Sequence, residues 1–370
     1  MENKVCCIFN YPPHYREAIF LIMEQELGCD FYFGDVEEGK IKPIDYNLFE
    51  GNPKKLETIK VIGNFIILKK SIRKSFAPYE SYILTGDPFI ISVWVMLIIN
   101  YITGKKTYLW CHGWYGRENL VKKILKKVFF RLSTGVLLYG NYARDLMIEE
   151  GLKANKLHVI YNSLDYFNQI QFRDSAPSTS IEDINFKDKA PVIIFTGRLT
   201  KIKNIDLLLE AQEILVKRGI IVNSLIIGDG PECKGLKKLV TELNLEDNCH
   251  FFGACYEESV LASLYKLADV CVSPGNVGLT AIHAMTYGCP VITHDNFPNQ
   301  MPEFEAIKEG LTGMFFKYQN STDLASKIEK WLSLSNGKEE IIRNSCYAQI
   351  DNYFNPERQI SIIKSVIQSE

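Results

Sequence analysis

Short, continuous apolar runs alternate with stretches of helical periodicity along most of the chain. In the first half these runs stand at residues 5–9, 82–84, 107–110, 136–139 and 158–161. A strand that is apolar at every position is buried on both faces, which is typical of parallel strands covered by helices. The alternation therefore predicts an α/β fold built on a doubly wound parallel sheet.

The alternation stops and then starts again, which predicts two domains. Residues 174–189 are rich in Ser, Pro, Asp and Lys without a sustained period, as in a linker. Apolar runs then return at 192–195, 225–227, 250–252, 270–272 and 291–293, and helical patterns stand near 204–218, 232–244, 256–267 and 278–288. We predict an N-terminal domain at 1–173, a linker at 174–189 and a C-terminal domain at 190–354. A helix at about 355–370 should pack back on the first domain.

Composition narrows the functional classes. A formal net charge of -2 on 370 residues argues against a general nucleic-acid binder, which carries a basic excess. The ten cysteines show neither a CxxC pair nor Cys/His metal spacing, so we interpret them as core residues of a cytoplasmic protein without a signal peptide. The longest apolar run, 89–99, is shorter than the ~20 residues that a bilayer requires, which favours a buried helix.

Two glycine-containing loops follow consecutive strands of the second half. Gly197, Arg198 and Lys203 follow the run at 192–195, and Gly228 and Gly230 follow the run at 225–227. An arginine fork and a lysine point charge at the carboxyl end of a strand suit a diphosphate, and glycine lets the backbone approach a ligand. The alternatives are a solvated basic turn and a simple tight turn.

A third loop opens the helix near 278–288. Its residues Asn276, Val277, Gly278 and Leu279 follow a buried strand, and glycine-rich backbone at a helix start can cradle phosphate or sugar hydroxyls. His283 lies one turn into that helix. It either faces the ligand or is a core histidine with a protein partner.

The order of these motifs resembles that of the family 4 retaining glycosyltransferases, which have the GT-B fold. The matching stretches are GRL-x3-K, GDGP, SPGNVGLTAIHAMTYGCPVITHD and PEFEAIKEGLTG, within residues 190–320. The resemblance implies two Rossmann-like domains facing across a cleft. It also implies that Arg198 and Lys203 bind the donor diphosphate, and that the helix-opening loop binds donor sugar and phosphate.

The sequence departs from the family at its usual E-x7-E pair. The matching positions are Gly275 and His283, so both carboxylates are missing. An imidazole could still form a hydrogen bond with a ribose hydroxyl, and Asn276 or backbone amides are left to meet the sugar. Downstream, Glu303 or Glu305 could supply a carboxylate. Glu305 matches a common family position and is included among the donor-binding candidates.

The first half offers fewer candidates. His112 follows the strand at 107–110 and resembles the acceptor-side HG element of the family, which makes it the candidate catalytic residue; a turn histidine is the alternative. Arg16, in the loop after the first strand, is a candidate for the acceptor side or an ordinary surface arginine. Residues 120–131 read LVKKILKKVFFR, which suits either an anionic membrane surface or a solvated helix face.

Together these features predict transfer of a sugar from a nucleotide diphosphate sugar to an acceptor hydroxyl. The resemblance implies a retaining enzyme of cell-surface polysaccharide or lipopolysaccharide assembly, with a glycan acceptor that could be lipid-linked at the inner face of the membrane. We expect no metal or other cofactor, because no DxD-like acidic cluster follows a strand. The alternatives are a nucleotide-sugar epimerase, a phosphorylase or a catalytically silent partner subunit. The lost carboxylate pair favours the last, and the intact Arg198 and Lys203 argue against it.

Overall fold

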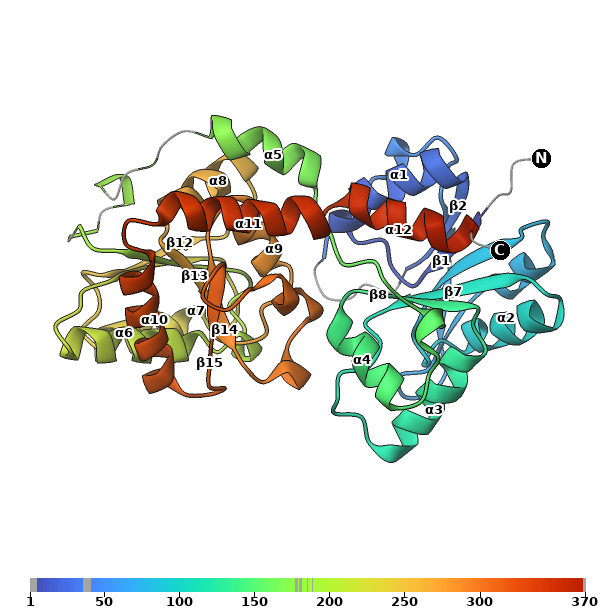
Figure 1. Ribbon diagram of the computed structural model, residues 1–370. Helices are drawn as coiled ribbons and strands as arrows, with labels where there is room; N and C mark the ends of the chain where they lie inside the picture. The colour runs from blue at the N-terminus through green and yellow to red at the C-terminus, as the bar shows by residue number, and fades with distance from the viewer. Residues whose placement is uncertain are drawn as a thin grey trace. The chain divides into compact units, whose positions relative to one another are not determined.

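The computed structural model describes residues 5–35, 41–176, 179, 182–184, 186–187 and 189–368. The chain divides into two compact units (Figure 1). Unit 1 comprises Met1–Asp165 and Asn355–Glu370, and unit 2 comprises Tyr166–Phe354. Helix α5 (Tyr166–Ser175), which the sequence analysis divided between the first domain and the linker, belongs to unit 2. Within the predicted linker, residues 177, 178, 180, 181, 185 and 188 lie outside the described residues.

Unit 1 is built on a seven-stranded sheet in which every neighbouring pair is parallel. Its strands, in spatial order, are β3 (Lys54–Leu56), β2 (Cys29–Gly34), β1 (Val5–Phe9), β6 (Ser81–Thr85), β7 (Lys106–Cys111), β8 (Gly135–Leu138) and β9 (Leu157–Val159). A separate antiparallel pair joins β4 (Thr58–Lys60) to β5 (Ile66–Leu68). The helices are α1 (Glu17–Leu27), α2 (Ile91–Ile102), α3 (Leu120–Arg131), α4 (Asn141–Glu149) and α12 (Pro356–Gln368).

Central strand β1 shows why its sequence is apolar throughout. Cys7 and Phe9 belong to the core beneath α1 and α12, whereas Cys6 and Ile8 belong to the core on the other face, beneath α2 and α3. Successive side chains of a strand point to opposite faces, so a strand covered by helices on both sides needs apolar residues at every position. The adjacent cysteines are therefore core residues on opposite faces.

Helix α12 completes unit 1 from the far end of the sequence. It lies beside α1 (Figure 1). Ile360, Ile363 and Val366 belong to the same buried cluster as β1 and α1. The side chain of Gln359 donates to the carbonyl oxygen of Tyr161 at 3.0 Å. Buried apolar surface and a long-range hydrogen bond thus hold residues 356–368 to the first part of the chain.

Unit 2 repeats the same plan with a six-stranded parallel sheet. Its strands, in spatial order, are β12 (Cys249–Gly253), β11 (Asn223–Ile227), β10 (Val192–Thr196), β13 (Val270–Ser273), β14 (Val291–His294) and β15 (Gly313–Phe316). Figure 1 shows α6, α7 and α10 on one face and α5, α8, α9 and α11 on the other. Their bounds are α6 (Ile205–Lys217), α7 (Cys233–Glu242), α8 (Glu258–Leu267), α9 (Thr280–Thr286), α10 (Ser321–Ser335) and α11 (Glu339–Tyr353).

The predicted fold class of two Rossmann-like, doubly wound α/β halves is confirmed. All ten strands expected from the apolar runs are present, and each overlaps its predicted range. The run at 89–99 forms α2, which is buried along one face but exposes Ile98, Tyr101 and Ile102 near its end. Within the described residues, no helix combines the length and hydrophobicity that spanning a membrane requires.

Candidate active site

Three loops of unit 2 meet where the order of its strands reverses. The chain runs outward from β10 through β11 to β12, and then returns to the other side of β10 as β13. In doubly wound sheets, ligands bind at the carboxyl ends of the strands at such a point. Backbone hydrogen bonds join the loops here: Gly197 N to Ile227 O, Leu199 N to Asp229 O and Gly275 N to Lys203 O, each at 3.0 Å.

Glycines allow two of these loops to pack against each other. A Cβ atom on Gly228 would lie 1.9 Å from the carbonyl oxygen of Gly197, and one on Gly230 would lie 2.3 Å from that of Leu199. Neither position can hold a side chain unless the neighbouring backbone moves. The glycines of the predicted GDGP turn are therefore needed for loop packing. They also leave the backbone uncovered by side chains at the carboxyl ends of the strands.

Gly275 explains the first departure from the family pattern. A Cβ atom here would lie 2.1 Å from the carbonyl oxygen of Ile202 and 2.7 Å from the Cα atom of Lys203. The Lys203 loop thus occupies the space that a side chain at position 275 would require. A carboxylate at this position is incompatible with the backbone that this chain adopts.

Lys203 is a charged residue whose side chain is fixed by a hydrogen bond where the three loops meet. It ends the short 3-10 helix Lys201–Lys203, and its Nζ atom donates to the carbonyl oxygen of Asn276 at 2.6 Å. Burial lowers the pKa of Lys203 to about 8, and the nearby Glu303 opposes that shift. Glu303 is itself only 2% exposed. The structure therefore brings Glu303, rather than Glu305, into electrostatic contact with this lysine, and an anionic ligand would stabilise the ammonium form.

Arg198 and Glu305 are placed differently from Lys203. The side chain of Arg198 is exposed and forms no hydrogen bond or ion pair with the described residues. It follows the same strand as Lys203. Glu305 lies in the 3-10 helix Pro302–Ala306, where its carbonyl oxygen accepts from Lys308 Nζ at 3.2 Å.

The loop that opens α9 offers one polar side chain, and one of its backbone amides is already occupied. The Oδ1 atom of Asn276 is buried without a hydrogen-bond partner among the described residues. Val277 is fully buried, and its N–H group donates to Gln300 Oε1 at 2.8 Å, so this amide is already occupied. Gly278 has a φ of 48°, and Leu279 is half-buried. Asn276 is therefore the member of the loop best suited to meet a ligand.

His283 has a carboxylate partner that the sequence analysis missed. Its Nε2 atom lies 2.7 Å from Glu258 Oε1, and the hydroxyl of Tyr287 donates to the same oxygen at 2.5 Å. Burial would raise the pKa of Glu258, but the hydrogen bonds from these two residues outweigh it and hold that pKa below its ordinary value. The ring of Tyr265 lies 5.2 Å from that of His283, and its hydroxyl forms a hydrogen bond with Thr196 at the end of β10. A carboxylate from α8 thus lies beside the position where the family has a glutamate.

His112 lies in an aromatic environment at the carboxyl end of β7 in unit 1. Its ring is 4.8 Å from that of Tyr139 and 5.9 Å from that of Tyr115. Its Nδ1 atom is buried and has no hydrogen-bond partner within the described residues. Burial, together with the charges of Arg16 and Lys126, lowers the pKa of His112 to about 4. The imidazole is therefore neutral at physiological pH and keeps one lone pair as an acceptor.

Arg16 belongs to the same cluster. It ends the 3-10 helix His14–Arg16, and a guanidinium N–H group donates to the hydroxyl of Tyr139. The guanidinium carbon lies 5.3 Å from the ring centroid of Trp110. The sequence candidates Arg16 and His112 are thus brought together around Tyr139.

The basic helix α3 is less basic on its surface than its sequence suggests. Lys126 Nζ lies 2.7 Å from Glu118 Oε1, and Lys123 forms an ion pair with Glu150. The exposed side chains of α3 include four apolar ones, Leu120, Val121, Ile124 and Val128. The helix therefore presents an apolar ridge with fewer unpaired basic side chains than the five in its sequence.

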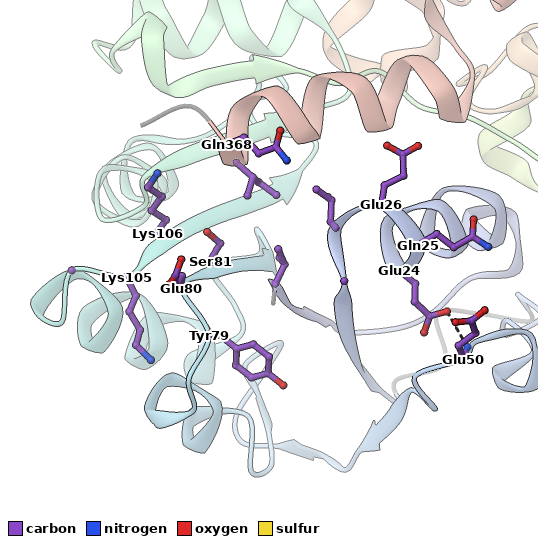
Figure 2. Close-up of a pocket in the computed structure, with 15 residues that line it drawn as sticks. Glu24, Gln25, Glu26, Glu50, Tyr79, Glu80, Ser81, Lys105, Lys106 and Gln368 are labelled. Atoms are coloured by element: carbon purple, nitrogen blue, oxygen red, sulfur yellow. Dashed lines mark hydrogen bonds between the residues drawn. The ribbon is translucent and has the colours of Figure 1, made fainter. Parts of the chain in front are cut away.

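A pocket of about 1000 Å³ lies at the amino ends of the unit 1 strands, away from His112 and Arg16 at their carboxyl ends. It is lined by the first residues of β1, β6 and β7, and Figure 2 shows Glu24, Glu26 and Glu50 set apart from Lys105 and Lys106. Several of these charges already have protein partners. Glu24 accepts from the backbone N–H of Glu50 at 3.0 Å, and Lys105 donates to backbone carbonyls. None of the predicted site residues lines this pocket.

No group of three or more His, Cys, Asp or Glu side chains in the part of the chain that the structure describes is arranged to hold a metal ion. The cysteines do not form disulfides, and burial raises the pKa of the Cys111 and Cys271 thiols to about 12. Thiol groups such as these are inert packing groups at physiological pH.

Comparison with known proteins finds matches to glycosyltransferases. Residues 178–346 match a family described as "Glycosyl transferases group 1", a segment that contains the three loops of unit 2. The chain is 24% identical over 282 residues to the alpha-D-kanosaminyltransferase of Streptomyces kanamyceticus, covering 73% of this chain and 68% of that protein. It is 26% identical to the alpha-monoglucosyldiacylglycerol synthase of Streptococcus pneumoniae, covering 49% of this chain and 41% of that protein.

Solved structures resemble the whole chain. The Anabaena protein HepE in complex with UDP superposes with a TM-score of 0.72 at 18% identity, covering 99% of this chain and 100% of that one. The lipopolysaccharide outer core galactosyltransferase WaaB superposes with a TM-score of 0.70 at 16% identity, covering 98% of this chain and 99% of that one. These likenesses show the GT-B fold, and the family match with the named relatives supports a glycosyltransferase enzyme.

Proposed function

We propose that this chain transfers a sugar from a nucleotide diphosphate sugar to an acceptor hydroxyl during assembly of a cell-surface polysaccharide or lipopolysaccharide glycan. The observation that carries the proposal is Lys203, whose half-buried side chain donates to the Asn276 carbonyl at the point where the strand order reverses. Burial lowers the pKa of Lys203 even though Glu303 lies nearby, so a further anion would stabilise its ammonium form. The diphosphate of a nucleotide sugar would supply that anion, and the similar protein HepE has been solved with UDP and with UDP-glucose bound.

The same groups suit the chemical step. As the bond between the anomeric carbon and the diphosphate breaks, negative charge develops on the departing phosphate oxygen. Lys203 is in place to stabilise that charge, and the exposed guanidinium of Arg198 can bind it with two parallel hydrogen bonds. These two cations supply the charge neutralisation, so we propose a reaction that needs neither metal nor another cofactor.

His112 is proposed to contact the reacting sugar or the acceptor. Its lowered pKa keeps the imidazole neutral, so it can accept a hydrogen bond from a hydroxyl across the physiological pH range. Retention of the anomeric configuration follows the resemblance to family 4 retaining enzymes and belongs to the proposal on that ground.

Nucleotide binding tests the proposal directly. We expect calorimetry with UDP, GDP, ADP and dTDP to find micromolar or tighter binding of at least one of them. Lys203→Gln and Arg198→Gln should each weaken that binding about tenfold to a hundredfold, because each removes a hydrogen bond from a charged group. Lys201→Gln is the matched control, since Lys201 is an exposed lysine of the same loop. Equal affinity in all three variants would contradict the assignment of this site to the donor.

A catalytically silent partner subunit is the second candidate, because Gly275 leaves no space for the first family carboxylate. The partner subunit would bind nucleotide sugar without cleaving it. Release of UDP from UDP-glucose, or of the corresponding nucleotide from whichever donor binds, would exclude the silent role. Binding without turnover in the presence of a range of glycan acceptors would favour it.

We also propose that the acceptor is lipid-linked and that the apolar ridge of α3 contacts the inner face of the membrane, which would make this a peripheral cytoplasmic protein. A relative is named as the synthase of a glucosyl lipid. Val121→Ser with Ile124→Ser should reduce sedimentation with vesicles of phosphatidylglycerol and phosphatidylcholine, because both side chains are exposed on the ridge. Ile341→Ser, an exposed isoleucine of unit 2, is the control. Equal sedimentation of both variants and the wild type would reject this contact.

A further inference from the structure

We propose that Arg16, together with Trp110, His112 and Tyr139, forms an oxyanion subsite in unit 1 that recognises a phosphate or carboxylate carried by the acceptor. The inference rests on the proposed function and adds the chemical class of the acceptor to it.

The guanidinium of Arg16 is a half-buried cation without a counter-ion. No carboxylate among the described residues forms an ion pair with it; its hydrogen-bond partner is the neutral hydroxyl of Tyr139. Its other close neighbours are the rings of Trp110 at 5.3 Å and Tyr139 at 5.6 Å. Aromatic faces attract a cation but do not neutralise it. A partly desolvated charge of this kind is costly until an anion pairs with it.

Three buried polar atoms of the cluster have no hydrogen-bond partner in the part of the chain that the structure describes. They are Arg16 Nε, Trp110 Nε1 and His112 Nδ1. Native proteins satisfy most buried polar groups, so three exceptions around one aromatic cluster call for an explanation. The guanidinium and indole nitrogens can only donate, and a ligand that pairs with them must accept. An oxyanion meets that requirement and also neutralises the guanidinium.

His112 favours a single anionic group rather than a more highly charged ligand. The charge of Arg16 helps to keep the imidazole neutral, so the cluster carries one positive charge, that of the guanidinium. A neutral imidazole still offers one donor and one acceptor, which suits a group that bears both an oxyanion and a nearby hydroxyl. A phosphorylated or acidic sugar has this chemistry.

The position of the cluster assigns it to a ligand of unit 1. Arg16 lies just beyond the carboxyl end of β1, while His112 and Tyr139 immediately follow β7 and β8. This is the edge of a parallel sheet at which ligands bind. An oxyanion here could come from the acceptor or from the donor diphosphate, and the two sources can be separated by experiment.

The test is calorimetric titration of inorganic phosphate, and separately of acetate, into the full-length protein saturated with UDP. UDP occupies the donor site, so a remaining anion site must be a second one. We expect the wild type to bind one anion, and Arg16→Gln to weaken that binding about tenfold to a hundredfold. Arg16→Lys should have an intermediate affinity because it keeps the charge but loses the fork. Arg73→Gln, an exposed arginine of the same unit, should behave as the wild type.

Two further measurements separate the possible outcomes. Arg16→Gln should bind UDP as tightly as the wild type and should melt at the same or a higher temperature, because it removes an uncompensated charge. No anion binding by the UDP-saturated wild type, or equal anion binding in Arg16→Gln, would overturn the subsite. A loss of UDP affinity in Arg16→Gln would assign Arg16 to the donor diphosphate and overturn the acceptor assignment. Failure of the wild type to bind any nucleotide would count against the proposed function itself.

Discussion

Raising the pH above 8 should weaken nucleotide binding because Lys203 loses its positive charge. Burial lowers the pKa of this amine to about 8, whereas a bound diphosphate would stabilise the ammonium form and raise that pKa again. Binding above pH 8 must then be accompanied by proton uptake. At pH 9 only about one tenth of the free protein carries the charge, so affinity should be about tenfold lower than at pH 7.

The terminal phosphate of UDP should not produce the same change, because its second pKa is near 6 and it is largely ionised from pH 7 upward. The contribution of Lys203 to the free energy of unfolding changes in the opposite direction as the pH rises. Between about pH 8 and 10.5 the unfolded chain holds a proton that folded Lys203 has lost, so this residue adds to the free energy of unfolding as pH rises. Deprotonation of Lys203 therefore does not destabilise the fold, and weaker binding at pH 9 could not be explained by unfolding that this residue causes.

The assay is calorimetric titration of UDP, or of whichever nucleotide binds best, at half-unit steps from pH 7 to 9.5. Buffers of different ionisation enthalpy would measure the proton uptake directly. Lys203→Gln should bind weakly at pH 7 and show almost no further change up to pH 9.5. A flat affinity profile for the wild type, or the same slope in Lys203→Gln, would refute the role assigned to this amine.

Three further outcomes follow from the packing of unit 2. Gly275→Ala should lower the melting temperature and weaken nucleotide binding, at a cost of about 1–3 kcal/mol or more, because its Cβ would overlap backbone; Gly235→Ala, where the added Cβ meets no atom within 4 Å, should be neutral or stabilising. His283→Glu should lower the melting temperature by placing two carboxylates together, and the melting temperature should recover when Glu258→Gln is added. Burial lowers the pKa of His294 to about 4, so this residue should contribute about 3 kcal/mol to the fall in the free energy of unfolding between pH 6.5 and 4, and His294→Gln should reduce the fall by about that amount in urea denaturation.

Much of the fold could be predicted from local pattern, and the exceptions have physical causes. Apolar runs identify the central strands of both sheets because those strands are covered on both faces. Strand β2 was missed because Asp30 interrupts its apolar run, and this carboxylate is stabilised by the hydroxyl of Tyr79 at 2.6 Å, a partner distant in sequence. An interrupted run looks polar until such a tertiary partner is known.

The candidate site likewise combines features that the sequence reveals with features that depend on partners distant in the chain. Glycines after strands are recognisable in sequence, so the loops of Gly228 and Lys203 could be identified in advance. The partner of His283 could not, because Glu258 comes from another helix 25 residues earlier in the chain. Likewise, the ion pair between Lys126 and Glu118 depends on a loop folding back on α3, so the basic character of that helix was overestimated.

The packing of α12 on α1 has a consequence for how the protein is made. Unit 2 is one continuous segment inserted between the two parts of unit 1, so all of it leaves the ribosome before residues 356–368 do. Until then the core beneath α1 lacks Ile360, Ile363 and Val366. Unit 2 can therefore fold during synthesis while this side of unit 1 stays open to solvent, exposing apolar surface that a chaperone could bind. A nonsense mutation that removes α12 would accordingly damage the half that carries Arg16 and His112, and leave intact unit 2, the half proposed to bind the nucleotide.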